Sequence, residues 1–180
     1  MQRPKEVEIG LDLKFFSIKG TWEPNDAERR AAWELYVELV TRISVVPLND
    51  GIVRETLTSL HSLFGATREI LRRYGPEVAE PKRDGEYNFG YLAVAMLNFV
   101  LRPLLSYWHP AMQSWEAQRA DEAPLAEHEA AWQRISELRD EIERTRQDLL
   151  QYASVLAEAC GIPDLSTAVP RGAGGAISAS

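Results

Sequence analysis

The chain has 180 residues, of which 45% are hydrophobic and 26% charged, a composition typical of a globular protein that buries a core of its own. Twenty basic and 27 acidic side chains give a net charge of −7, which argues against nucleic acid as a partner. A single cysteine, Cys160, excludes an intrachain disulfide and a thiolate metal cluster. No signal-peptide pattern is recognisable, so we expect a cytoplasmic protein.

The first predicted element is a β-strand over residues 6–19, where apolar and polar residues alternate. The only other candidate strand is short and runs from Leu165 to Val169. A strand without a partner in its own chain tends to pair with another chain, so we expect this one to add to a second copy or to another protein. The predicted interface residues here are Val7, Ile9, Leu11, Leu13 and Phe15.

Two helices are predicted next. The first begins near Pro24, where Asn25 and Glu28 have the spacing of a capping box, and it carries an apolar stripe that includes Trp33. The second begins at residues 49–51 and ends at residues 75–76. Gly65 within it predicts a close helix crossing, since an interior glycine otherwise costs stability.

Residues 86–119 form the most apolar part of the chain, and a helix that is apolar on every side must be buried. We therefore predict a central buried helix here, kinked at Pro103 and Pro110. The 20 residues from Phe89 to Trp108 have the length of a membrane span. Because Asn98 and Arg102 interrupt them, we expect a buried helix and no membrane span.

The last predicted helix begins after residues 121–124 and continues to Cys160, a length of about 50 Å at 1.5 Å per residue. Its apolar residues keep heptad spacing, which is typical of a helix that associates with a partner. Those predicted to form this second interface are Trp132, Ile135, Ile142 and Leu149.

Four residues of the central helix are candidates for ligand binding: Asn98, Arg102, Tyr107 and His109. Asn98 and Arg102 share a helix face and suit an anion or carboxylate. The structural alternative is that Arg102 pairs with a glutamate of a neighbouring helix or caps backbone carbonyls freed by Pro103. His109 and Glu116 are candidates for acid–base chemistry, while the alternative is that His109 caps a helix and the tryptophans beside it pack in the core. The histidines have no metal-ligand spacing, so no metal is expected. Walker loops and dinucleotide-binding fingerprints are absent from the sequence, so no cofactor is expected.

The predicted fold is mostly α, an up-down bundle of about four helices with a short N-terminal β-strand. Residues 1–20 would be a strand extension, residues 21–161 the bundle, and residues 162–180 a flexible tail. The leading functional hypothesis is a non-catalytic interaction module, an adaptor or oligomerising scaffold that binds itself or another protein. The alternative is a small-molecule or anion-sensing domain with a pocket at the central helix. An enzyme is the third hypothesis.

Overall fold

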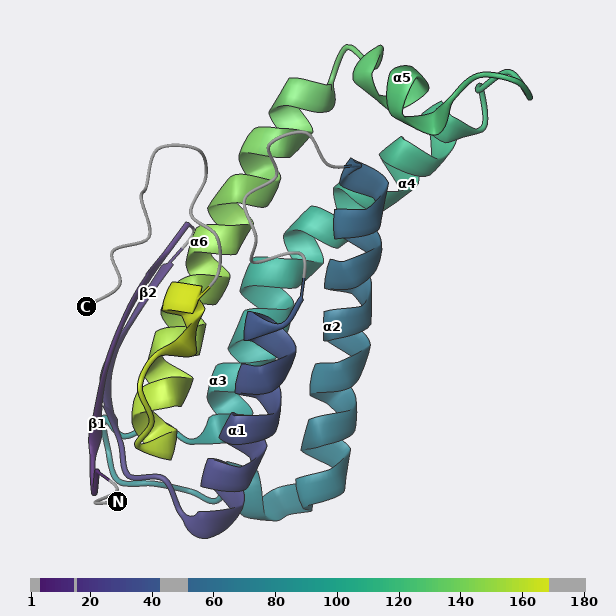
Figure 1. The fold of residues 1–180 in the computed structure, drawn as a ribbon. Helices are drawn as coiled ribbons and strands as arrows, with labels where there is room; N and C mark the ends of the chain where they lie inside the picture. Colours follow the sequence, from purple (N-terminus) through teal and green to yellow (C-terminus); the bar gives the residue numbers. More distant parts are fainter. Residues whose placement is uncertain (1–3, 15, 43–51, 169–180) are drawn as a thin grey trace.

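The computed structural model describes residues 4–14, 16–42 and 52–168 (Figure 1). The prediction of a mostly helical chain with β structure at the N-terminus is confirmed. The β structure is a two-stranded antiparallel sheet. In chain order the elements are β1 (Val7–Leu13), β2 (Phe16–Trp22), α1 (Asp26–Val40), α2 (Val53–Tyr74), the 3-10 helix η2 (Gly75–Ala79), α3 (Phe89–Ala95), the π-helical turn η3 (Met96–Leu101), α4 (Arg102–Glu116), α5 (Leu125–Ala130), α6 (Ile135–Cys160) and the 3-10 helix η4 (Leu165–Ala168).

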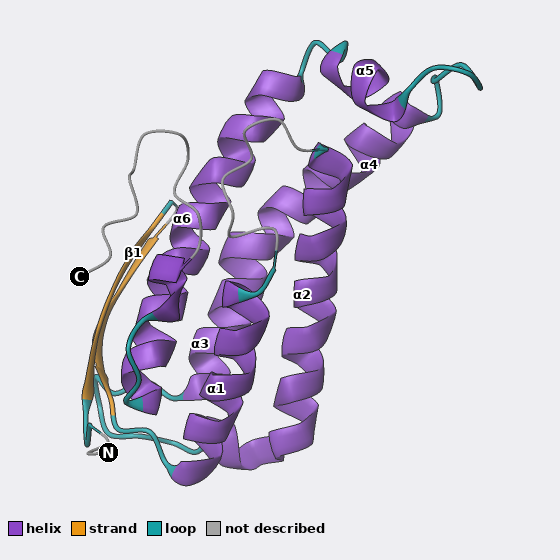
Figure 2. Ribbon diagram, viewed as in Figure 1, coloured by secondary structure: helices purple, strands orange, loops and turns teal. Residues whose placement is uncertain are grey.

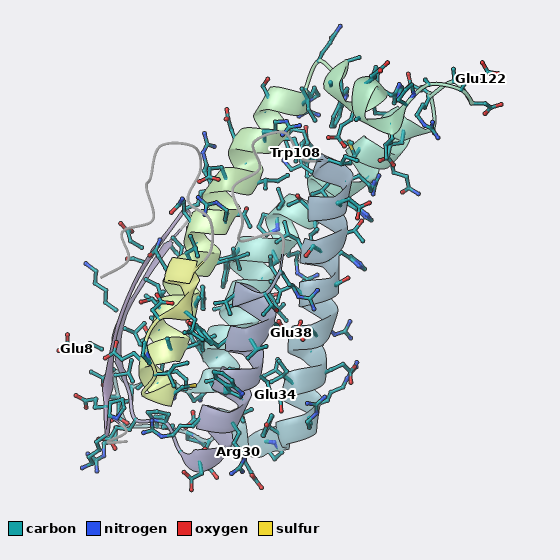
Figure 3. The ribbon with its side chains drawn as sticks, in the orientation of Figure 1. Glu8, Arg30, Glu34, Glu38, Trp108 and Glu122 are labelled. Carbon is teal, nitrogen blue, oxygen red and sulfur yellow. The ribbon has the colours of Figure 1, made fainter. Side chains whose placement is uncertain are left out.

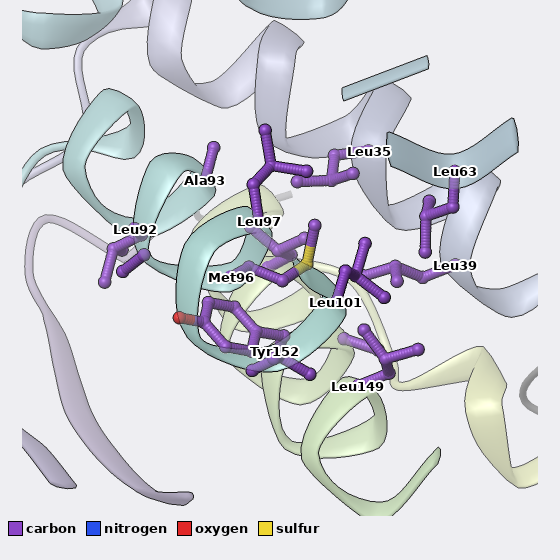
Figure 4. Close-up of a cluster of buried hydrophobic side chains, with 14 of the residues drawn as sticks. Leu35, Leu39, Leu63, Leu92, Ala93, Met96, Leu97, Leu101, Leu149 and Tyr152 are labelled. Carbon is purple, nitrogen blue, oxygen red and sulfur yellow. The ribbon is translucent and has the colours of Figure 1, made fainter. Parts of the chain in front are cut away.

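Four helical segments lie side by side: α1, α2, α6 and the continuous segment α3–η3–α4 (Figure 2). Helix α1 contacts both α2 and α6, and the α3–η3–α4 segment contacts the same two helices. The space between the four is filled by buried leucines and Met96 (Figure 4). The short α5 lies beyond one end of the long helices, and the sheet covers α6.

The prediction of one strand over residues 6–19 is wrong, because the chain turns at Lys14 and forms a hairpin. In its register Val7 faces Trp22 and Leu13 faces Phe16. The strand therefore has its partner within the chain. The prediction of a second strand from Leu165 to Val169 is also wrong for the residues that the structure describes, because Leu165–Ala168 forms the 3-10 helix η4.

The residues predicted to form the two interfaces lie largely in the core of the chain. The inward side of β1 packs on α6, and Val7, Ile9, Leu11 and Leu13 are buried there. On the helical side Trp132, Ile142 and Leu149 are buried as well, while Ile135 is half-buried. Phe15 lies outside the described residues. These side chains therefore offer little free surface to a partner.

The predicted last helix is two helices. Helix α5 ends at Ala130, and α6 begins at Ile135 and extends 26 residues, about 39 Å at 1.5 Å per residue. Between them the Trp132 indole stacks on the Trp115 indole, with ring centroids 6.3 Å apart. This contact lies where the chain turns back across the end of α4. The prediction of one continuous helix of about 50 Å is therefore wrong.

The central segment is continuous but not buried on every side. Its π-helical turn η3 ends two residues before Pro103. The proline ring and its missing N–H disrupt α-helical hydrogen bonding in the turn before it. Helix α4 continues through Pro110, where a kink was predicted. Tyr91, Val94, Phe99 and Tyr107 are exposed, contrary to the prediction. Gly65 does not mark a helix crossing, since a Cβ there would meet nothing within 4 Å.

The capping box predicted for the first helix is confirmed, with Asn25 as the N-cap of α1. Its acidic member, Glu28, has 0% exposure and accepts four hydrogen bonds, including one from the Asn25 N–H at 2.7 Å. The other donors are the Trp22 indole at 3.1 Å, the Phe89 N–H at 3.0 Å and the Lys82 ammonium at 2.8 Å. One carboxylate thus joins β2, α1, α3 and the loop before α3.

Glu28→Gln is expected to lower the free energy of unfolding by about 3 kcal/mol or more, because it leaves Lys82 without its buried counter-charge and places an amide where two donors converge. Urea unfolding measures this. Glu8→Gln is the control, since Glu8 projects from the outer face of the hairpin (Figure 3). A loss below about 1 kcal/mol would contradict the role given to this carboxylate.

The hairpin turn is held on α6 by polar contacts. Lys14 pairs with Glu141, and the Gln151 amide both donates to the Asp12 carbonyl and accepts from its N–H, at 3.0 and 2.9 Å. Asp148 lies beneath the turn and is bonded to the Lys14 backbone. Burial raises the pKa of its carboxyl, with Glu141 and Asp12 adding to the effect and Lys14 opposing it.

A carboxyl whose pKa is raised by folding stabilises the protein below its unfolded pKa of about 4, and this contribution is lost as pH rises through the folded value. Asp148→Asn keeps an acceptor for Lys14 but removes the charge. We expect the variant to match the wild type near pH 4 and to be more stable at pH 7.5 in urea unfolding. Asp140→Asn, on the exposed side of the same helix, should show no such change with pH; equal behaviour of the two variants would refute the assignment.

Candidate functional site

The four residues predicted to bind a ligand are separated in the structure, and only two of them stay together. The Arg102 Nε donates to the Asn98 Oδ1 at 3.1 Å, and its guanidinium lies 5.4 Å from the centre of the Phe64 ring. Arg102 is exposed and pairs with no carboxylate among the described residues. The alternative of a buried arginine paired with a glutamate is therefore wrong.

Tyr107 lies further along α4, where its hydroxyl accepts a hydrogen bond from Arg134 at 3.0 Å. The same guanidinium lies 4.4 Å from the centre of the Trp108 ring. Trp108 and Trp132 are both buried and meet edge to face, so α4 is held here by an aromatic contact with the segment between α5 and α6. The prediction that Trp108 packs in the core is confirmed.

His109 lies on another side of α4, with its ring stacked on that of His61 at a centroid distance of 5.6 Å. Burial lowers the pKa of the His109 imidazole, and the nearby charge of Arg54 lowers it further. The Glu116 carboxylate is held by the Arg54 guanidinium, with 2.6 Å from Nε to Oε1. Glu116 thus serves a structural ion pair that ties α4 to the start of α2.

A second buried acid, Glu129 of α5, lies at the N-terminus of α2. Its carboxylate accepts hydrogen bonds from the N–H groups of Val53 and Arg54, at 2.7 and 3.2 Å. A negative charge at a helix N-terminus satisfies free donors and favours the helix dipole. The polar groups at this end of the molecule are therefore engaged in holding α2, α4 and α5 together.

An apolar groove lies at the opposite end of the central segment, between α2 and α3, and we call it the α2–α3 groove. It encloses about 530 Å³ and is lined by Leu71, Gly75, Val78, Ala79, Asn88, Gly90, Tyr91 and Val94. At its floor α3 approaches η2 closely, since a Cβ on Gly90 would lie 2.9 Å from the Ala79 Cβ. Tyr91 is 53% exposed and Val94 44% exposed at its rim.

Two arginines continue this face beyond the groove. Arg102 follows Val94 and Asn98 along the central segment, and Arg68 lies between Phe64 and Leu71 on the outer side of α2. Neither forms an ion pair with a carboxylate in residues 4–14, 16–42 or 52–168. From Tyr91 to Arg102 the face is about 16 Å long at 1.5 Å per residue. Asn98 and Arg102, predicted as ligand residues, thus stand at one end of an apolar face that was not predicted.

Within residues 4–14, 16–42 and 52–168, one helical stretch, Phe89–Glu116, has the length and hydropathy to cross a membrane, but 61% of its most apolar window is buried inside the protein. Among the residues that the structure describes, no group of three His, Cys, Asp or Glu side chains is arranged to hold a metal ion.

We compared the chain with protein-family models, with curated protein sequences and with solved structures. None of the three comparisons found a match.

Proposed function

We propose that this protein is a non-catalytic interaction module, an up-down bundle of four helices that docks an acidic amphipathic helix of a partner protein in the α2–α3 groove. The observation that carries the proposal is the exposed apolar rim of this groove, continued by two arginines without carboxylate partners.

The apolar part of the face has the character of a docking site. Tyr91 and Val94 are one helical turn apart and both are about half exposed, beside the half-buried Leu71 of α2. A contiguous apolar patch next to a groove is typical of a binding surface, whereas single exposed apolar residues need no explanation. An amphipathic helix can place its apolar face in such a groove, with anchor residues spaced three and four apart.

The charges favour an acidic occupant. Two other arginines of α2 are paired with carboxylates, Arg72 with Glu69 and Arg73 with Glu34. Arg68 and Arg102 lack such a partner among the described residues, although the chain as a whole is acidic. Uncompensated charges at an interface steer association and select partners of opposite sign. A face of about 16 Å accommodates roughly three helical turns of the partner.

The test uses two labelled peptides of about 15 residues, roughly four helical turns, with the same apolar stripe. One carries glutamates on its flanks and the other carries lysines. Fluorescence anisotropy with the full chain should show binding of the glutamate peptide and much weaker binding of the lysine peptide. Equal affinity for the two peptides, or binding of neither, would overturn the proposal.

Two variants locate the binding. Val94→Glu should abolish binding of the glutamate peptide, and Arg102→Glu should shift preference toward the lysine peptide. Both positions are exposed, so the thermal unfolding midpoint should change little. Lys19→Glu makes the same charge change on the outer face of the hairpin and should leave binding intact. If sedimentation instead shows a dimer that Val94→Glu dissociates, the occupant is a second copy of this chain.

A further inference from the structure

A second and larger concavity lies on the outward side of α1, and we call it the α1 groove. Its volume is about 950 Å³, and its walls are the end of α2 on one side and the end of α6 on the other. It is lined by Asp26, Arg29, Arg30, Trp33, Glu34, Tyr74, Cys160 and Ile162. Pockets that hold small molecules enclose roughly 300–1,000 Å³, so this groove has sufficient volume for one.

Most charges in the α1 groove are already engaged. The Glu34 carboxylate accepts a hydrogen bond from the Tyr74 hydroxyl at 2.6 Å and pairs with Arg73. The Arg29 guanidinium donates to the carbonyl of Pro4 at 2.6 Å and to that of Ala159. These contacts fix the walls of the groove and leave little of either side chain for a ligand.

Arg30 is different. It is exposed, and it forms no hydrogen bond or ion pair with any part of the chain that the structure describes. Figure 3 shows it on the same side of α1 as Glu34. Its charge lies close enough to Tyr74 to oppose the rise in the pKa of that phenol, which is caused first by burial and then by the bond to Glu34. The groove therefore contains one available guanidinium.

Trp33 provides an apolar wall next to this cation. Its indole is 45% exposed and lies 6.1 Å from the Tyr36 ring, centre to centre. The sequence pattern placed Trp33 in the apolar stripe of α1 together with Tyr36 and Leu39. Tyr36 and Leu39 are buried, whereas Trp33 is exposed. An exposed indole held at the edge of a concavity stacks favourably on a flat aromatic ring.

We propose that the α1 groove binds a small carboxylate that carries a flat aromatic group, with Arg30 pairing with the carboxylate and Trp33 stacking on the ring. A guanidinium binds a carboxylate through two parallel hydrogen bonds, which fixes its orientation. One available cation between Asp26 and Glu34 suits a single negative charge and disfavours a polyphosphate. This site is separate from the α2–α3 groove, because the two grooves share no lining residue.

The test uses 1-naphthylacetate as the probe, with 1-naphthylmethylamine and acetate as the matched cation and the anion without a ring. Cys160 is the single cysteine of the chain, it is half-buried, and it lines the groove. Its rate of alkylation by N-ethylmaleimide therefore reports occupancy. Naphthylacetate should slow the alkylation, and the amine and acetate should not. Equal protection by the amine, or no protection by millimolar naphthylacetate, would overturn the proposal.

Calorimetry on variants completes the test. Arg30→Gln should weaken naphthylacetate binding by roughly tenfold or more, because it removes a charge-assisted hydrogen bond. Trp33→Leu should weaken it as well. Arg72→Gln removes an exposed arginine outside the groove and should have no effect, and Val94→Glu should also leave binding unchanged. Unaltered binding by Arg30→Gln would refute the assignment.

Discussion

The carboxylate of Glu28 is the contact on which the arrangement of this fold most depends. A fully buried charge is tolerated only when donors surround it, and here the donors come from β2, the start of α1, Lys82 and the first residue of α3. These segments must therefore converge on one point. Because α1 forms the floor of one groove and α3 a wall of the other, the same carboxylate fixes the placement of both surfaces.

Local sequence signals found the capping box of α1, since both of its members lie within one turn. They did not find the contacts of Glu28 with Lys82 and Phe89, which are 54 and 61 residues away along the chain. The hairpin was not predicted because its turn at Lys14 contains no glycine, asparagine or proline, the residues that usually mark a turn. The alternation itself was interpreted correctly as β structure, and it places Val7, Ile9, Leu11 and Leu13 inward.

The candidate sites were harder to predict than the core. An apolar run without polar interruption predicts burial, so Tyr91 and Val94 were assigned to the interior although they form the rim of a groove. Trp33 was assigned inward for a different reason, because it belongs to the apolar stripe of its helix, and it is exposed. Conversely, Arg102 was expected to need a buried partner, and it is exposed beside Asn98. Exposure of a helix face depends on where its neighbours end, and that information is not contained in the periodicity of one helix.

The π-helical turn η3 sets how the two halves of the central segment are rotated relative to each other. A π turn accommodates one residue more than an α-helical turn, and one residue corresponds to a rotation of about 100°. If the same residues between Met96 and Leu101 were wound as a plain α-helix, every side chain of α4 would be turned by about that angle relative to α3, and the buried Trp108 would no longer face Trp132. Loss of a single residue within η3 would instead convert the wide turn into an α-helical one and leave the faces of α4 in place. In homologous chains, a deletion of one residue should therefore be tolerated in this turn more readily than elsewhere in the central segment.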